Sequence, residues 1–479
     1  MKLYSENENY KLYQGNMLDM LEVIKPNSID SIITDPPYGL TSITKRFGKE
    51  NSAECQYGKD GSFARLSRGF MGKEWDGSGI EYNIETWQKC YEVLKPGGYL
   101  LAFGGSRTFH RIACAIEDAG FEIRDTIMWL YGSGFPKSMN IGLAIDKKNG
   151  VESKVIGERS GAKNNADNSN ASSFVKGKVG YKPNFVQKEA QNEWSGWGTA
   201  LKPSFEPIIV ARKPFKGSLV DNVIEHSVGG INIDECRVGN EARTYKGMSK
   251  NKPEGAGTFR DDNWIPKDIE VNVNGRFPAN TILTYDETDF DEVCGGFPNT
   301  KSVRSARGGA RNDGTTVYNK IPQNINMNYE CGFNDSGSAS RYFYCAKASK
   351  KDRDEGLEEF EDGNITDGRK AISDRTYLRK ETPRKNTHPT VKPTTLMQYL
   401  VRLVTPNGGT ILDPFNGSGS TGKAVMYENK ERNKNYKYIG IELTEEYLPI
   451  AKARIEYVCN LENKKESQLT IFDLENNNE

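Results

Sequence analysis

The first 147 residues alternate between short apolar runs typical of buried strands and apolar positions spaced as on one face of a helix. We predict strands over residues 10–12, 28–34, 99–103 and 121–131, and helices over residues 17–24, 84–94 and 107–119. Strands that alternate with helices are typical of a parallel sheet covered by helices on both faces.

The same pattern returns near the end of the chain. Helices are predicted over residues 394–405, 421–429 and 445–458, and strands over residues 409–412 and 436–441. Because this half has too few strands for a sheet of its own, we expect its strands to join those of the first half. The predicted fold class is α/β, with a doubly wound, mostly parallel, Rossmann-like sheet in circularly permuted order.

The segments between these two halves lack that alternation. Residues 132–200 are rich in Gly, Ser, Asn and Lys and are predicted to be loop. Residues 205–211 are predicted to form a strand, and Pro207 suits a sheet edge because proline has no amide hydrogen to donate. Residues 216–384 contain short β-like runs, among them 281–284 and 342–345, and are predicted to form a separate mixed module.

The most specific motif is Asp35-Pro36-Pro37-Tyr38, which directly follows a predicted strand. Two prolines cannot join a sheet ladder, so the chain leaves the sheet at the end where open α/β sheets bind ligands. The Asp35 carboxylate and the Pro36 carbonyl can both accept hydrogen bonds from one amino group, and the Tyr38 ring offers a stacking face for a flipped base. We predict a catalytic site at these four residues; an ordinary turn is the alternative.

A glycine-rich turn, Gly417-Ser418-Gly419-Ser420-Thr421-Gly422, stands between a predicted strand and a predicted helix. Its spacing is that of a dinucleotide-binding loop, and Glu442 ends the next strand, where an acid that binds ribose belongs. A carboxylate beside the turn, Asp413, repels a pyrophosphate but attracts a positively charged amino acid group. S-adenosylmethionine therefore fits better than a nicotinamide dinucleotide.

Composition narrows the class of protein. The mean hydropathy is −0.70, and neither an 18-residue apolar run nor a basic-then-apolar leader is present, so we expect a cytoplasmic protein that does not bind membranes. Eight cysteines without a Cys-x-x-Cys pair and three histidines predict no metal site. Because 65 basic residues balance 65 acidic ones, any affinity for nucleic acid must come from local clusters.

In this order the motifs resemble the β-class of DNA amino-methyltransferases, in which Asp-Pro-Pro-Tyr comes before Phe-x-Gly-x-Gly and a long insertion separates the two. Further matching motifs are Gly15-Asn16-Met17-Leu18, Leu94-Lys95-Pro96-Gly97-Gly98 and His388-Pro389-Thr390-Val391-Lys392-Pro393. The resemblance implies methyl transfer from S-adenosylmethionine to the exocyclic amine of a base flipped out of double-stranded DNA.

Carried over residue by residue, the resemblance also implies a set of cofactor contacts. These are Asn16, Asn386, Lys392, Pro393, Asp413, Phe415, Gly417, Gly419, Ser420, Thr421 and Glu442. The family usually has an acid at the position of Asn16, so the contact to the cofactor adenine is altered here. An amide can still pair with adenine.

The implied domain organisation divides the chain into six parts. They are a catalytic half (1–147), a loop-rich insertion (148–200), an edge strand (201–215), a target-recognition module (216–384), a cofactor-binding half (385–462) and a tail (463–479). Basic residues in the module are expected to contact DNA phosphates, with a solvated surface as the alternative. They are Arg304, Arg307, Arg311, Lys350 and Lys351.

The first residue of the catalytic motif bears on the target base. In the family that the chain resembles, Asp at this position mostly accompanies adenine N6 and Ser mostly accompanies cytosine N4, so adenine is predicted. Cytosine N4 is the alternative, followed by the glutamine side chain of a protein, whose methyltransferases also carry Pro-Pro-Tyr, typically after Asn. A homodimer and a cognate restriction endonuclease are left open as partners.

Overall fold

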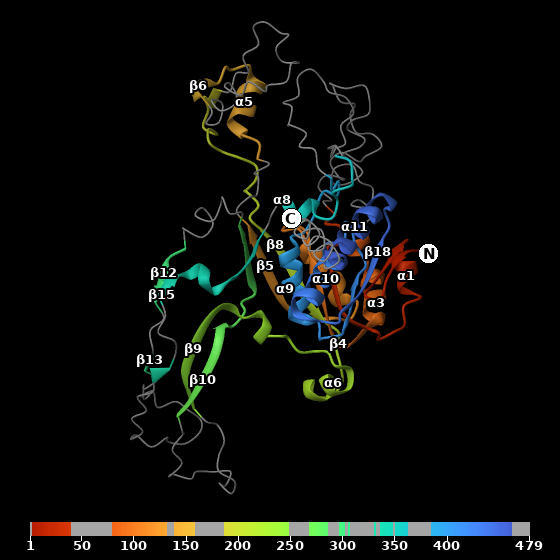
Figure 1. Ribbon diagram of the computed structural model, residues 1–479. Helices are drawn as coiled ribbons and strands as arrows, with labels where there is room; N and C mark the ends of the chain where they lie inside the picture. The colour runs from red at the N-terminus through yellow and green to blue at the C-terminus, as the bar shows by residue number, and fades with distance from the viewer. Residues whose placement is uncertain are drawn as a thin grey trace, which may run out of the picture. The chain divides into compact units, whose positions relative to one another are not determined.

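The computed structural model describes residues 2–39, 79–131, 138–158, 186–248, 268–285, 297–301, 305–306, 330–331, 336–347, 350–362 and 385–461. The chain divides into two compact units, Met1–Gly132 with Phe205–Glu479, and Ser133–Ser204 (Figure 1). Each unit is described by itself.

The first unit is built on a ten-stranded sheet. In spatial order its strands are β1 (Lys2–Glu6), β2 (Tyr10–Gln14), β18 (Lys437–Glu442), β17 (Thr410–Asp413), β3 (Ile29–Thr34), β4 (Leu94–Phe103), β8 (Phe205–Arg212), β5 (Glu122–Tyr131), β11 (Thr281–Tyr285) and β16 (Tyr344–Lys347). From β2 to β4 all strands are parallel, and β5, β11 and β16 are parallel to one another. The mostly parallel α/β sheet predicted from the sequence is confirmed.

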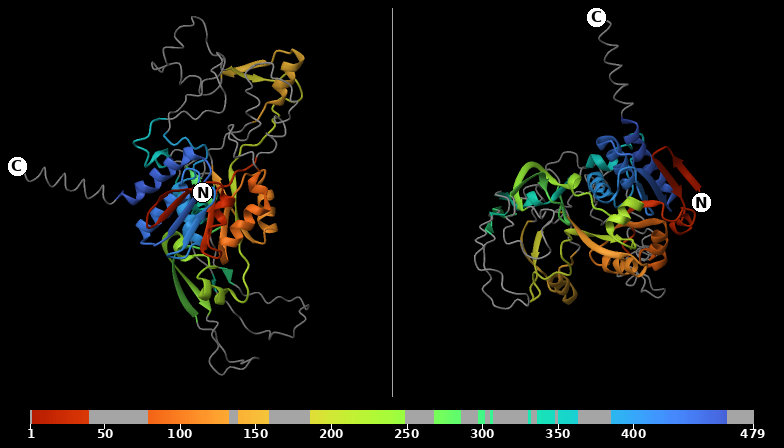
Figure 2. Two further views of the ribbon diagram at one scale, coloured as in Figure 1. Left: turned by 90° about the vertical axis from the view of Figure 1, so that its right-hand side faces the viewer. Right: turned by 90° about the horizontal axis from the view of Figure 1, so that it is seen from below.

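The two ends of the chain meet within this sheet. β18 pairs with β2, and β17 pairs with β3, where Ile411 lies opposite Ser31 (Figure 2, red beside blue). The cofactor half predicted at the C-terminal end therefore completes the sheet begun at the N-terminal end. This is the permuted strand order that the sequence predicted.

Helices cover both faces of the sheet because neighbouring strand residues point to opposite sides. Ile32 and Leu100 pack against α1 (Met17–Leu21), α3 (Ile84–Val93) and α4 (Phe109–Asp118). Ile33 and Leu101 pack on the other side, against α9 (Thr394–Val404), α10 (Ser420–Arg432) and α11 (Leu448–Cys459). Such double-sided burial explains why these strands are apolar runs without alternation.

The placement of β8 corrects an expectation from the sequence. This strand was predicted at a sheet edge, but it lies in the interior, antiparallel to both β4 and β5. Pro207 is tolerated because β4 ends beside it. The last β4 pair joins Phe103 with Ile208, and just beyond it the Pro207 carbonyl accepts from the Gly104 amide at 3.0 Å. The missing amide hydrogen of Pro207 thus falls outside the ladder.

The expectation of a separate central module is also wrong in part. β11 and β16 overlap the predicted β-like runs, yet they extend the main sheet beside β5. The other elements described between residues 213 and 384 are α6 (Leu219–His226), η6 (Asp234–Cys236), β9 (Val238–Met248), β10 (Asp268–Arg276), β12 (Asn299–Lys301), β13 (Ser305–Ala306), β14 (Glu330–Cys331), β15 (Ser336–Ser338), η7 (Ala339–Tyr342) and α8 (Lys350–Asp354). Two further short helices are η4 (Ile80–Tyr82) and η8 (Glu445–Tyr447).

The second unit contains regular structure where loop was predicted. The Asn140 side chain caps α5 (Ile141–Asn149) by accepting from the Leu143 amide at 3.0 Å. β6 (Lys154–Glu158) pairs with β7 (Val186–Glu189) in an antiparallel ladder. The segment is therefore structured in part, although its sequence carries little periodicity. The domain boundaries given above stay predictions.

Within the described parts of the chain, no helix has the length and apolar character needed to span a bilayer.

Candidate active site

A cavity of about 540 Å³ lies where β3, β17 and β18 end. Parallel strands bring their carboxyl ends to one edge of the sheet, which explains how residues far apart in sequence meet there. The predicted site residues that line it are Asn16, Asp35, Pro36, Pro37, Tyr38, Lys392, Asp413, Phe415, Gly417, Ser420, Thr421 and Glu442. The predicted catalytic and cofactor motifs thus share one cavity.

Asp413 joins the ends of β3 and β17. Its carboxylate accepts from the Thr34 hydroxyl at 2.7 Å, from the Thr421 hydroxyl at 2.6 Å and from the Phe415 amide at 3.1 Å. Burial raises the pKa of Asp413 to about 6, against these hydrogen bonds, which lower it. Because Thr34 directly precedes Asp35, this contact ties the Asp35-Pro36-Pro37-Tyr38 motif to the glycine loop.

The glycine loop needs its glycines for steric reasons. Gly417 has φ +53°, and a Cβ there would lie 2.9 Å from His388 Nε2. Gly419, at φ +74°, starts α10, and a Cβ there would lie 3.0 Å from Ala451. The loop can therefore pass close to both neighbours only without side chains.

A buried cation lies beneath this loop. Arg454 Nη1 donates to the Ser418 carbonyl at 2.8 Å and to the hydroxyls of Ser418 and Ser420 at 3.1 and 3.2 Å. Burial lowers the pKa of Arg454 to about 10. These contacts fix the backbone and the hydroxyls on the cavity side of the loop.

Glu442 is held by two backbone amides at the end of β18. Gly417 and Thr444 each donate to its carboxylate at 2.7 Å. Burial raises the pKa of Glu442 to about 7, although both amides lower it. Each carboxylate oxygen keeps a further lone pair for a ligand hydroxyl.

The Asp35 carboxylate is paired in a way that the sequence did not predict. Lys392 Nζ donates to Asp35 Oδ2 at 2.6 Å, and the Tyr38 hydroxyl donates to Oδ1 at 2.9 Å. Burial raises the pKa of Asp35, while the Lys392 ammonium opposes that shift. Lys392 lines the cavity, and its expected place at the methionine end of the cofactor stays a prediction; its ammonium lies on the Asp35 carboxylate.

A second carboxylate, Glu206 of β8, completes this cluster. Its carboxylate lies 2.8 Å from the Tyr38 hydroxyl, whose single proton is shared between Asp35 and Glu206, and 3.5 Å from Lys392 Nζ. Burial alone would lower the pKa of Lys392, but Asp35 and Glu206 outweigh it and raise the pKa. Glu206 was not predicted from the sequence, where its only signal is a charged residue within the apolar run that forms β8.

Three predicted cofactor residues are not among those that line the cavity. Asn386 is buried away from it, where its amide donates to the Arg353 carbonyl at 3.1 Å. Pro393 stands at the start of α9, and Gly419 packs on α11. Asn16 does line the cavity, but its side-chain oxygen caps α1 by accepting from the Leu18 amide at 3.0 Å.

The predicted DNA contacts are only partly within the described chain. Arg304, Arg307 and Arg311 lie outside the described residues. Lys350 and Lys351 begin α8, where Lys351 is exposed. Their role stays a prediction.

A family model described as DNA methylase, of the N6/N4 type, matches residues 29–453. The chain belongs to this family. Membership confirms the resemblance found in the sequence and the S-adenosylmethionine cofactor that it implied.

Among curated proteins, the type II methyltransferase M.HindIII of Haemophilus influenzae is 25% identical over 240 residues, which are 46% of this chain and 64% of that protein. The type II methyltransferase M2.LlaDCHI of Lactococcus lactis subsp. cremoris is 32% identical over 133 residues, 27% of this chain and 44% of that protein. The matches thus span less than two thirds of either relative.

Among solved structures, the cytosine-N4-specific PvuII DNA methyltransferase covers 97% of this chain and 96% of its own, with 12% identity and a TM-score of 0.36. The M1.HpyAVI–SAM complex covers 93% and 98%, with 14% identity and a TM-score of 0.34.

Proposed function

We propose that this N6/N4 DNA methylase transfers a methyl group from S-adenosylmethionine to N6 of an adenine flipped out of double-stranded DNA. The observation that carries the proposal is the single cavity shared by the Asp35 motif and the glycine loop, tied together by Thr34 and Asp413. A cofactor bound at the loop would present its reactive end within the same space as a base at Asp35.

The residues of the loop fit S-adenosylmethionine. The cavity volume is in the range of ligand sites, and Gly417 leaves a cradle beside His388 that a Cβ would fill. We expect Glu442 to hold the ribose hydroxyls and Asp413 to favour the charged amino acid part. When bound, this cofactor supplies a methyl group carried by a positively charged sulfur.

The chain's own part in the reaction follows from the Asp35 cluster. An exocyclic amine is a weak nucleophile because its lone pair is delocalised into the ring. Hydrogen bonds from the amine to Asp35 and to the Pro36 carbonyl would orient that lone pair, and within the described chain the Pro36 carbonyl accepts no other hydrogen bond. The nitrogen would become positive as it takes the methyl group and the bond from that carbon to sulfur breaks, and the Asp35 carboxylate would stabilise the charge until the amine releases a proton to water.

Two observations support adenine over cytosine as the target. Asp35 stands where the family mostly has Asp for adenine and Ser for cytosine, and a carboxylate is a stronger acceptor for the amine than a hydroxyl. Glu206 adds a second negative charge near Asp35, which favours either amine as it becomes positive and does not by itself choose the base. Cytosine N4 stays the second candidate.

The division of roles can be tested with two variants of the full chain. Asp35→Ala is expected to abolish methylation of DNA from a methylation-free strain and to leave S-adenosylmethionine affinity within a few-fold. Glu442→Ala is expected to weaken cofactor binding by about 1.5 to 3 kcal/mol, because charge-assisted hydrogen bonds are lost. Identical cofactor affinities in the two variants would contradict this division.

The target atom is decided by digesting the methylated DNA to nucleosides for mass spectrometry. We expect 6-methyladenine. A product of 4-methylcytosine alone would replace adenine by cytosine, and label in protein but not in DNA would favour the glutamine alternative. The homodimer and the partner endonuclease stay predictions that this experiment does not address.

A further inference from the structure

The lysine that pairs with Asp35 is carried by a segment that has no regular structure of its own. We call residues 386–394 the strap; it runs from Asn386 to the start of α9 and places His388 and Lys392 at the cavity. The Lys392 ammonium lies 2.6 Å from Asp35. Because the strap forms no helix or strand that would fix its backbone, contacts from another element must hold Lys392 in this position.

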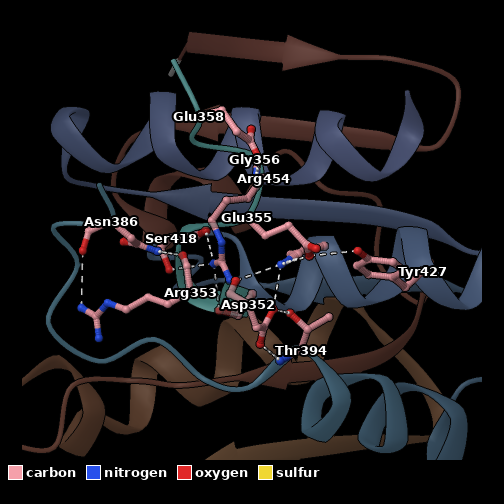
Figure 3. A network of polar contacts seen from close by, with 12 residues as sticks. Asp352, Arg353, Glu355, Gly356, Glu358, Asn386, Thr394, Ser418, Tyr427 and Arg454 are labelled. Atoms are coloured by element: carbon pink, nitrogen blue, oxygen red, sulfur yellow. Dashed lines mark hydrogen bonds and ion pairs between the residues drawn. The ribbon is translucent and has the colours of Figure 1, made fainter. Parts of the chain in front are cut away.

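The element that fixes the strap is α8, which precedes it in the chain (Figure 3). At the start of the strap, Asp354 accepts from the Asn386 amide at 3.0 Å, and Arg353 donates to the carbonyls of Asn386 and His388. Leu357, just after α8, is fully buried against Tyr447 and anchors the segment.

At the end of the strap, a single side chain makes the contacts. Asp352 accepts from the Thr394 amide at 2.8 Å and from the Thr394 hydroxyl. It therefore caps α9 from outside, because Pro393, at the cap position, offers no side-chain hydrogen bond. Lys423, buried beneath, donates to Asp352 at 2.7 Å and holds the carboxylate in place.

We propose that Asp352 is a positioning residue for methyl transfer: by capping Thr394 it holds Lys392 on Asp35. Only Pro393, whose φ is fixed by its ring, lies between Lys392 and the capped residue, so a shift at Thr394 is passed on to Lys392. The inference rests on the proposed function and extends it to a residue outside the cavity lining.

The chain offers a matched control for this role. Glu355 pairs with the same buried Lys423 at 2.9 Å and accepts from the Tyr427 hydroxyl at 2.9 Å. Among the described residues, Glu355 makes no hydrogen bond or ion pair with the strap. Asp352→Ala and Glu355→Ala each leave Lys423 with one carboxylate; only Asp352→Ala removes the cap, whereas Glu355→Ala removes the Tyr427 hydrogen bond.

The first measurement needs neither cofactor nor DNA. Amide hydrogen exchange of residues 386–394 is followed in the full chain and in both variants. We expect Asp352→Ala to exchange about fivefold to tenfold faster there, as the loss of a helix cap implies, and Glu355→Ala to match the wild type. Asp352→Asn should restore slow exchange, because an amide oxygen caps as well as a carboxylate.

The second measurement is methylation of DNA. In Asp352→Ala we expect kcat to fall by about tenfold, while the KM for S-adenosylmethionine stays within about threefold, because Arg353 still holds His388, the strap residue beside Gly417. In a plot of kcat against pH, the acid limb of Asp352→Ala should also lie at higher pH than that of the wild type. The groups that face Asp35 are Lys392, Tyr38, Glu206 and Asp413, and only Lys392 among them supplies the positive charge that keeps Asp35 ionised.

The outcomes separate the inference from the proposed function. Wild-type protein that methylates no DNA would refute the function, while the exchange data would still test the strap. With an active wild type, equal losses in Asp352→Ala and Glu355→Ala, or no gain from Asp352→Asn, would overturn the positioning role. An unchanged acid limb in Asp352→Ala would do the same.

Discussion

At the level of single residues, the two carboxylates of the cofactor half titrate near neutral pH because they are buried. Glu442 has a pKa of about 7 in the folded chain, against an ordinary value of 4.5. The folded chain therefore binds more protons than the unfolded chain between these values, and the free energy of unfolding falls as pH rises through this window.

Glu442→Gln is expected to remove most of this pH dependence. The wild type should lose up to about 3 kcal/mol of stability between pH 5 and pH 8, and the variant clearly less, since an amide does not ionise. Urea unfolding at the two pH values measures both slopes. In Glu442→Gln we expect the free energy of unfolding to keep a smaller dependence on pH, which comes from Asp413. An equal pH dependence in the two proteins would mean that Glu442 is already ionised at pH 5.

Gly417 gives a second prediction at this level. Gly417→Ala should cost about 1 to 3 kcal/mol of stability, because it adds a clash with His388 to the strain of a positive φ. Gly408→Ala is the control: its φ is +77°, but a Cβ there meets nothing within 4 Å, so only the strain of about 1 kcal/mol remains. If urea unfolding shows equal losses of stability in Gly417→Ala and Gly408→Ala, then Gly417 does not approach His388 closely.

At the level of elements, local patterns predicted most of the α/β strands and helices, because buried parallel strands and amphipathic helices have clear apolar spacing. The sequence did not predict which strands are neighbours. β8 looked like an edge strand because of Pro207, and only the end of β4 beside it explains its interior place. Glu206 and Asp352 were missed for the same reason: their partners are distant in sequence.

The pairing of β5 and β8 makes the second unit removable. Leu130 lies opposite Phe205 in this antiparallel pair, so the chain leaves and re-enters the sheet at neighbouring positions. Replacing residues 133–204 with a four-residue Gly-Asn linker should keep one cooperative urea transition and cofactor affinity, with a stability change within about 1 kcal/mol.

Deletion of residues 216–380 should behave differently. It removes β11, β16 and Asp352, and hence two strands of the sheet and the cap on α9. We expect this chain to lose cooperative unfolding and cofactor binding. If instead the shorter deletion were the one that unfolds, the division into two compact units would be wrong.

For the whole molecule, the balance of charge limits how the proposed DNA substrate can be bound. With 65 basic and 65 acidic residues, overall attraction is absent, and binding must rely on a few clustered cations. The affinity should fall steeply with salt, and changing Arg304, Arg307 and Arg311 together to Ala should reduce the slope of log K against log salt by about 3. Fluorescence anisotropy over a salt series measures it; an unchanged slope would exclude these arginines as phosphate contacts.

The meeting of the chain's two ends in one sheet has a consequence for synthesis. During translation β2 and β3 emerge early, but their partners β18 and β17 come only after residue 409, so pairs between β3 and β17 form at a very large separation in sequence. Until then both strands keep an open edge, the kind of surface on which chains aggregate. A ribosome that stops before residue 410 would thus release a chain with two exposed strand edges and half a cavity, and chaperone demand should peak during that interval.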